Sequence, residues 1–150
     1  MKKVVFLVNI LLFCSIFMVG CSDKRRDKSS NNSESDISIE NQKNMKLGII
    51  LETKEPEKAW NAFRFAVTSL KKGHVVKVFL MGEAVECQEI KHERFNVREQ
   101  MYSFLENGGD ILACGTCIKS RNMEESEVCP ISTMIDCVEM VEWADKVLTF

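Results

Sequence analysis

Short apolar runs alternate with stretches of helical apolar spacing along the C-terminal part of the chain. The runs Lys46–Leu51 and His74–Met81 are mostly aliphatic, which is typical of buried strands. Between them, from Glu57 onward, apolar residues recur every three or four positions until Gly73. This spacing predicts an amphipathic helix that ends at the glycine. Strand, helix and strand in this order predict a βαβ unit with two parallel strands.

The same alternation continues toward the C-terminus. Residues 83–94 are polar and weakly patterned, which predicts a loop with one helical turn. A second helix is expected after Asn96, its N-cap, and the segment Asn107–Gly109 ends it. The run Asp110–Ala113 then predicts a third strand, which leads directly into two cysteines.

A charged loop at 122–130 separates this strand from the last predicted elements. Ser132 or Thr133 can cap a helix that runs through about Ala144, and Lys146–Phe150 predicts a closing strand. The apolar residues expected on the inward face of this helix are Met134, Val138 and Val141, joined by Ile135 and Cys137.

Alternating strands and helices predict an α/β fold. We expect a flavodoxin-like, three-layer α/β/α arrangement with a mostly parallel sheet, formed by residues 46–150. Three aromatic residues of the first helix, Trp60, Phe63 and Phe65, have core spacing. Any of them left exposed would indicate a subunit interface.

Residues 1–21 have the three parts of an export signal. Two lysines precede an apolar stretch, which ends at Gly20 and Cys21. A small residue before a cysteine at this place resembles a bacterial lipobox, which predicts cleavage before Cys21 and lipidation of its thiol. Two alternatives stay open: an uncleaved membrane anchor, and translation from Met45, which would give a cytoplasmic protein.

The following segment, residues 22–45, is rich in Ser, Asn and charged residues. Such a composition cannot bury enough apolar surface to order itself, so it predicts a flexible tether. We therefore expect a domain that a lipid anchor holds at the cell membrane, on its extracytoplasmic face. The formal net charge of −2, without a dominant basic stripe, gives no reason to expect nucleic acid as a partner.

Cysteines carry the candidate chemistry. Seven are present, and five of them lie after the export segment, so at least one thiol there cannot pair within the domain. Cys114 comes at the carboxyl end of a predicted strand, and the next residues begin a helix whose N–H groups favour an anion. Lys119 and Arg121 add positive charge nearby. These surroundings favour a nucleophilic thiolate on Cys114.

Four interpretations of the cysteines stay open. In the first, Cys114 carries a sulfane sulfur as a persulfide, which needs no metal or cofactor. In the second, Cys114 and Cys117 form a dithiol/disulfide couple. In the third, Cys114, Cys117, Cys129 and Cys137 bind zinc, although a single C-x-x-C is a weak signal. In the fourth, the cysteines are structural, as small buried hydrophobes, in a non-catalytic interaction module.

Other residues offer less chemistry. The two histidines, His74 and His92, do not fall in a catalytic or metal-binding spacing. Glu52 follows the first strand at the same sheet edge as Cys114, where a solvated loop carboxylate is the simpler interpretation. The chain contains neither of the glycine-rich motifs that cradle phosphates, so nucleotide binding is not supported.

Several segments together resemble the DsrE/DsrF-like sulfur-relay family. They are Leu51–Thr53 with Ala59–Phe63, Lys72–Phe79, Ala113–Arg121 and Ala144–Phe150. The resemblance implies a flavodoxin-like fold, homo-oligomers such as trimers or hexamers, and a persulfide-carrying cysteine at Cys114. It also implies exchange of sulfur with a donor or acceptor, either a protein or a small sulfane-sulfur species. Cys117, Cys129 and Cys137 have no counterpart in the relay proteins, and the export signal is a further departure.

Overall fold

The computed structural model describes residues 44–150. The expected export signal, lipidation at Cys21 and nearly all of the expected tether lie outside the described residues. The elements, in chain order, are β1 (Lys46–Leu51), α1 (Pro56–Lys71), β2 (Val75–Leu80), the 3₁₀ helix η1 (Gly82–Glu89), α2 (Val97–Glu106), β3 (Asp110–Cys114), α3 (Gly115–Ser120), β4 (Ile131–Ser132), α4 (Met134–Trp143) and β5 (Lys146–Thr149).

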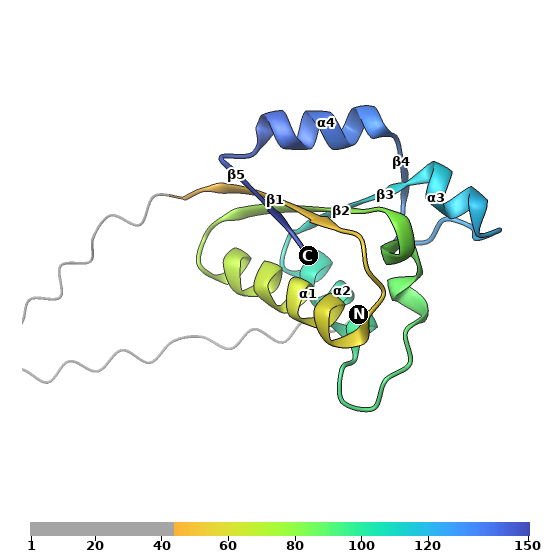
Figure 1. Cartoon of the computed structure of the whole chain (residues 1–150). Helices are drawn as coiled ribbons and strands as arrows, with labels where there is room; N and C mark the ends of the chain where they lie inside the picture. The colour runs from red at the N-terminus through yellow and green to blue at the C-terminus, as the bar shows by residue number, and fades with distance from the viewer. Residues whose placement is uncertain (1–43) are drawn as a thin grey trace, which may run out of the picture. The chain divides into compact units, whose positions relative to one another are not determined.

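The described strands form one five-stranded sheet in the order β4-β3-β2-β1-β5, and every neighbouring pair is parallel. Helices α1 and α2 lie on one face of the sheet and α4 lies on the other (Figure 1). The predicted three-layer α/β/α fold with a mostly parallel sheet is therefore confirmed.

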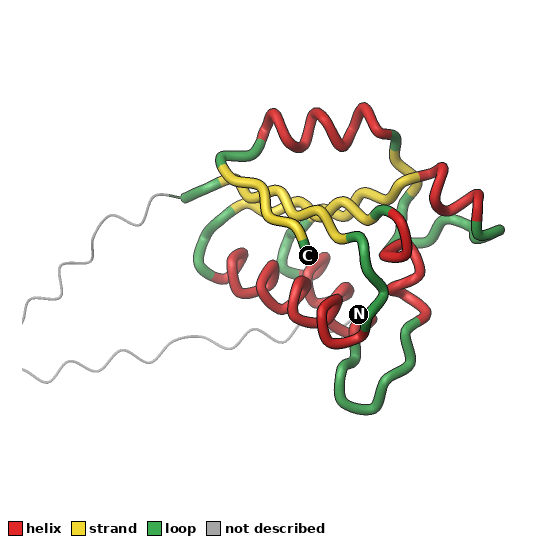
Figure 2. The backbone as a smooth tube through the Cα atoms, in the orientation of Figure 1, coloured by secondary structure: helices red, strands yellow, loops and turns green. Residues whose placement is uncertain are grey.

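The strand order explains why α4 lies alone on its face. The chain steps in one direction from β1 to β4, and then returns across the sheet to place β5 beside β1. Parallel crossovers are right-handed almost without exception, so a reversal of direction moves the connecting helix to the opposite face. Figure 2 shows α4 spanning the strands between the two sheet edges.

The main core lies between the sheet and helices α1 and α2. Phe63 and Phe104 meet there with ring centroids 6.1 Å apart in an edge-on arrangement. A smaller buried cluster lies on the α4 side of the sheet and consists of Phe79, Cys114, Cys137 and Met140. The candidate nucleophile thus belongs to the thinner of the two cores.

Two predicted helix caps are confirmed. The Asn96 side chain accepts a hydrogen bond from the Glu99 N–H over 3.1 Å at the start of α2. Thr133, rather than Ser132, caps α4 and forms a capping box with Asp136. Each side chain satisfies a backbone donor that has no partner within its own helix.

Two short elements differ from the sequence-based expectation. The predicted loop at 83–94 begins with the 3₁₀ helix η1, and its Ala84, Val85 and Cys87 are buried. The second is β4, whose two residues pair with Ala113 and Cys114 of β3. Neither has a periodic signal, because so few residues cannot display one.

The inward face predicted for α4 is wrong in four positions. Met134, Ile135, Val138 and Val141 are exposed, with Ile135 at 70%. The buried residues are Cys137, which was expected, and Met140. Apolar residues occupy most of the circumference of this helix outside the polar stripe of Asp136, Glu139 and Glu142, so its spacing does not identify which apolar stripe faces the sheet.

The aromatic residues of α1 do not share one environment. Phe63 is fully buried, whereas Phe65 is 40% exposed and packs near Phe150. The core position expected for Phe65 is thus only partly realised. Within residues 44–150, no helix has both the length and the apolar character needed to cross a membrane.

Candidate functional site: a thiol cavity at the carboxyl edge of the sheet

Cys114 lies where β3 ends and α3 begins, as the residue that precedes the first helical turn. Side chains alternate along a strand, so Ile111 and Ala113 point into the α1 and α2 core while Cys114 points to the α4 side. Its side chain is only 6% exposed. The predicted position at the strand terminus is confirmed, and the thiol is recessed.

A cavity of about 470 Å³ opens beside this thiol. Its walls come from the end of β2, the start of α3, and the segment that joins β4 to α4. Cys114, Cys117 and Lys119 all line it, so the structure brings together three of the four residues that the sequence singled out. Because α3 packs into the main core through Ile118 and α4 covers the other face, the cavity lies where the chain changes faces.

Gly115 sets how closely β4 approaches the helix start. A Cβ atom at this position would lie 3.0 Å from Cγ2 of Ile131 and 3.3 Å from the carbonyl oxygen of Ser132. The glycine between the two cysteines therefore leaves room for the edge strand that forms one wall of the cavity.

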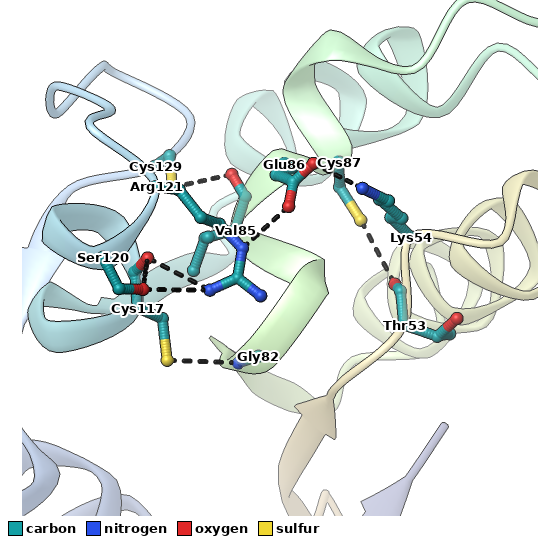
Figure 3. A network of polar contacts seen from close by, with 10 residues as sticks. All are labelled: Thr53, Lys54, Gly82, Val85, Glu86, Cys87, Cys117, Ser120, Arg121 and Cys129. Atoms are coloured by element: carbon teal, nitrogen blue, oxygen red, sulfur yellow. Dashed lines mark hydrogen bonds and ion pairs between the residues drawn. The ribbon is translucent and has the colours of Figure 1, made fainter.

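Cys117 lies one turn along α3 and shares the cavity with Cys114. Its Sγ accepts a hydrogen bond from the Gly82 N–H over 3.3 Å (Figure 3). Burial raises the pKa of the Cys117 thiol, and its hydrogen bond to Cys114 raises it further, against the opposing effects of the Gly82 N–H and the Arg121 charge. The pKa of the Cys117 thiol is thus raised above its ordinary value, and this thiol hydrogen-bonds to Cys114.

The guanidinium group of Arg121 bonds to groups other than the Cys114 sulfur. Its Nε bonds to Glu86 over 2.7 Å, and its Nη1 donates to the carbonyl oxygen of Cys117, which ends the helix (Figure 3). Lys54 bonds to the other oxygen of Glu86 over 2.6 Å. These two cations, Lys54 first, hold the pKa of Glu86 below its ordinary value. Arg121 thus joins α3 to η1, while Lys119 remains the cation at the cavity.

The other thiols are distributed over both cores. Cys87 and Cys129 are fully buried in the main core, where their Sγ atoms donate to the carbonyl oxygens of Thr53 and Val85 over 3.5 Å each. Burial raises the pKa of Cys87 to about 12 and that of Cys129 to about 11. Thiols held in this way are inert and pack as small hydrophobes.

The zinc arrangement considered from the sequence is not assembled. Cys129 lies in the main core, whereas Cys114 and Cys137 belong to the cluster on the α4 side. Among residues 44–150, no group of three or more His, Cys, Asp or Glu side chains is placed to hold a metal ion.

Sequence reasoning missed two residues that lie near Cys114, Met81 and Thr133, which line the same cavity. Cys137, which the zinc interpretation had grouped with Cys114, lies in the same buried cluster. The one available signal was Gly82, which directly follows the second strand at the same sheet edge. Parallel strands bring their carboxyl ends to one edge, but which side chains meet there depends on the strand order.

Comparison with known proteins places this arrangement in a family. A family model described as the DsrE/DsrF-like family matches residues 45–150, which covers the sheet, its helices and the thiol cavity. The chain belongs to the DsrE/DsrF-like family. The family resemblance stated from the sequence is thus confirmed for the domain, and the match begins at the residue before β1.

Similar chains exist in archaea and bacteria. The DsrE/DsrF-like chain is 35% identical over 100 residues to an uncharacterized protein of Methanopyrus kandleri, covering 63% of this chain and 83% of the relative. It is 32% identical over 115 residues to an uncharacterized protein of Methanocaldococcus jannaschii, covering 71% of this chain and all of the relative. A conserved protein of unknown function from Bacteroides thetaiotaomicron has a similar fold, with a TM-score of 0.58 and 20% identity over 70% of this chain and 94% of that one.

Proposed function

We propose that this DsrE/DsrF-like protein carries sulfane sulfur as a persulfide on Cys114. The observation that carries the proposal is a recessed thiol at a strand terminus that shares one cavity with a second thiol, Cys117, and a cation, Lys119. Family membership supports the same conclusion. A sulfur carrier needs one activated thiol in a cavity large enough for a sulfur donor, and it needs no metal.

The loading step is a thiol exchange. The Cys114 thiolate attacks the outer sulfur of a donor R–S–SH, forms a new S–S bond and releases R–S⁻, so that Cys114 becomes Cys114–S–SH. The S–H of Cys117 is a hydrogen-bond donor for the reacting thiolate, and Lys119 offers a positive charge at the cavity. Transfer to an acceptor thiolate reverses the same chemistry.

Cys117 is assigned the resolving role. Once Cys117 has lost its proton, its thiolate can attack the inner sulfur of the persulfide, which forms a Cys114–Cys117 disulfide and releases hydrosulfide. The two residues occupy the N-cap and third positions of α3, where side chains lie beside one another. The same adjacency favours a second candidate function, a dithiol/disulfide couple, in which the disulfide forms without any sulfur cargo.

The homo-oligomer expected from the family remains part of the proposal. Met134, Ile135, Val138 and Val141 form an exposed apolar stripe on α4, and Met134 also lines the thiol cavity. The acidic residues of α4 are Asp136, Glu139 and Glu142, and an exposed apolar stripe on a helix favours contact with another surface. We therefore place a second copy of the chain against this stripe, next to the cavity.

The lipid anchor at Cys21 and the extracytoplasmic location are also retained as proposals. They rest on the charged, apolar and small-residue order of the first 21 residues. Labelling of the full chain with a radioactive or clickable fatty acid in a bacterial host tests them. Loss of the label in Cys21→Ser is the expected result, and an unlabelled wild-type chain would contradict the anchor.

Mass spectrometry tests the carrier function. The reduced protein is incubated with a persulfide donor, excess donor is removed, and the intact mass is measured before and after treatment with a reductant. We expect a reducible gain of one sulfur atom that maps to the Cys114 peptide, is lost in Cys114→Ser and persists in Cys87→Ser. A dithiol couple instead predicts a Cys114–Cys117 disulfide with no sulfur gained, and neither a disulfide nor an added sulfur on Cys114 in Cys117→Ser.

A further inference from the structure

The recessed position of Cys114 limits which donors can reach it. Only 6% of this residue is exposed, and access runs through the cavity of about 470 Å³. A nucleophile must approach the outer sulfur of its donor in line with the S–S bond that breaks. A short sulfur chain fits into such a space whole, whereas a folded partner would have to insert the segment that carries its thiol.

The cavity wall matches a sulfur chain along its length. Met81, Ile131 and Met134 supply apolar surface, and two of them carry a polarizable thioether. Chains of sulfur atoms are themselves apolar and polarizable, with their negative charge concentrated at the ends. An apolar wall next to a nucleophile therefore suits the middle of such a chain.

The charge of the cavity suits the ends of the chain. Lys119 is the single charged residue among those that line it, and no carboxylate lines it. The nearby carboxylate of Glu86 is already bonded to Lys54 and Arg121. Ser132 adds a hydroxyl group near the start of α4, whereas the Thr133 hydroxyl is bonded to Asp136 in the capping box. An anion in the cavity thus meets one cation and no opposing charge on its walls.

We propose that the donor for Cys114 is a small linear polysulfide anion that enters this cavity, rather than a persulfide presented by a folded protein. The proposal rests on the carrier function above and names its substrate class. Lys119 binds one end of the anion, and the apolar wall holds its sulfur chain against Cys114.

The reaction balances without a further oxidant or reductant. The Cys114 thiolate attacks the terminal, protonated sulfur of hydrogen tetrasulfide, HS–S–S–S⁻. A bond forms between this sulfur and Sγ, the bond to the next sulfur breaks, and its electron pair leaves with the trisulfide dianion. The products are Cys114–S–SH and S₃²⁻, which takes a proton from water. Lys119 stabilises the charge that develops on the departing trisulfide.

Loading rates measured with two donors test the proposal. The full chain is mixed with tetrasulfide, or with a persulfidated carrier protein at equal concentration, and the persulfide on Cys114 is followed by quenched mass spectrometry. We expect faster loading by tetrasulfide. Lys119→Met should lower that rate by roughly fivefold, the size of one partly exposed charge pair. Lys119→Arg should retain the rate, and added salt should lower the rate in the wild type and in Lys119→Arg but much less in Lys119→Met.

The outcomes separate this inference from the carrier function. Equal or faster loading by the protein donor overturns the polysulfide proposal and leaves Cys114 as a carrier. An unchanged rate in Lys119→Met, with Lys71→Met on the outside of α1 as the matched control, overturns the role of the cation. Failure of both donors to load Cys114 overturns the carrier function itself.

Discussion

The backbone N–H of Gly82 donates a hydrogen bond to Sγ of Cys117, a residue 35 positions later in the chain. Gly82 has φ of +58°, and a Cβ atom there would lie 3.2 Å from the carbonyl oxygen of Glu52. A glycine two residues beyond the end of β2 therefore holds the second thiol of the site. The contact occupies the sulfur as an acceptor and leaves its S–H for Cys114.

Replacing this glycine should make Cys117 less acidic. The Gly82 N–H lowers the pKa of Cys117, so its displacement in Gly82→Ala should raise that pKa further. We expect the alkylation rate of the Cys117 peptide to reach its midpoint at higher pH than in the wild type. Gly108→Ala is the control, since Gly108 also has positive φ but lies in open space. A pH profile of Gly82→Ala that matches the wild type would show that the Gly82 N–H does not lower the pKa of Cys117.

Removing Cys114 should have the opposite effect on Cys117. The hydrogen bond to Cys114 and the charge on its sulfur both raise the pKa of Cys117. In Cys114→Ala, the pH midpoint of Cys117 alkylation should therefore fall, while burial keeps it above that of an ordinary thiol. Cys129→Ala removes a thiol from the main core and should leave the midpoint unchanged. An upward shift in Cys114→Ala would show that Cys114 stabilises the Cys117 thiolate instead.

The charge cluster at η1 should make stability depend on pH. Lys54 and Arg121 hold the pKa of Glu86 below its ordinary value of 4.5. A lowered pKa in the folded state stabilises the protein above pH 4.5, and this contribution is lost as the pH falls through the folded-state value. Glu86→Gln should lower the melting temperature by a few degrees at pH 7, and the difference should close in acid. A difference in melting temperature that persists at pH 3 would show that the charge of Glu86 is not its cause.

Gly109 should be intolerant of any side chain. A Cβ atom there would lie 2.3 Å from the ring of Phe104, which is fully buried. Forcing this ring to move should destabilise Gly109→Ala by roughly 1–3 kcal/mol. Gly108→Ala has only the backbone penalty of a positive φ, about 1–2 kcal/mol. Urea unfolding should therefore show Gly109→Ala to be at least as destabilised as Gly108→Ala, and a Gly109→Ala protein as stable as the wild type would show that Phe104 shifts without cost.

The exposed stripe of α4 should control assembly. Val138 is 51% exposed and lies in the middle of the stripe. A charge buried in an apolar interface is costly, so Val138→Lys should shift the protein toward the monomer in light scattering after size-exclusion chromatography. Glu106→Lys, on α2, should leave the mass unchanged. A wild-type protein that is already monomeric would remove the basis for the oligomer.

Local patterns of apolar and polar residues predicted most of the architecture. The strands that became β1, β2, β3 and β5, and the helices that became α1, α2 and α4, were placed within a few residues. Periods of two and 3.6 residues are properties of a contiguous stretch, and the caps at Asn96 and Thr133 act over three residues. Local physics therefore located both the elements and the strand terminus that carries Cys114.

The composition of the site depended on contacts that no local pattern contains. Glu86 and Arg121 meet across 35 positions, and so do Gly82 and Cys117. The outward face of α4 was misassigned because both of its stripes are apolar. The two-residue strand β4 exists only because β3 provides its hydrogen-bonding partner.

The sequence by itself determined that a βα succession would place a thiol at the end of a strand, because strand and helix periods are encoded residue by residue. Only the tertiary structure decided that Cys114 is recessed, that Cys117 is held by Gly82, and that Lys119 rather than Arg121 is the cation of the cavity. The strand order and the return of the chain to β5 determine which strand ends and helix starts meet at the cavity. Strand order is a property of the whole sheet.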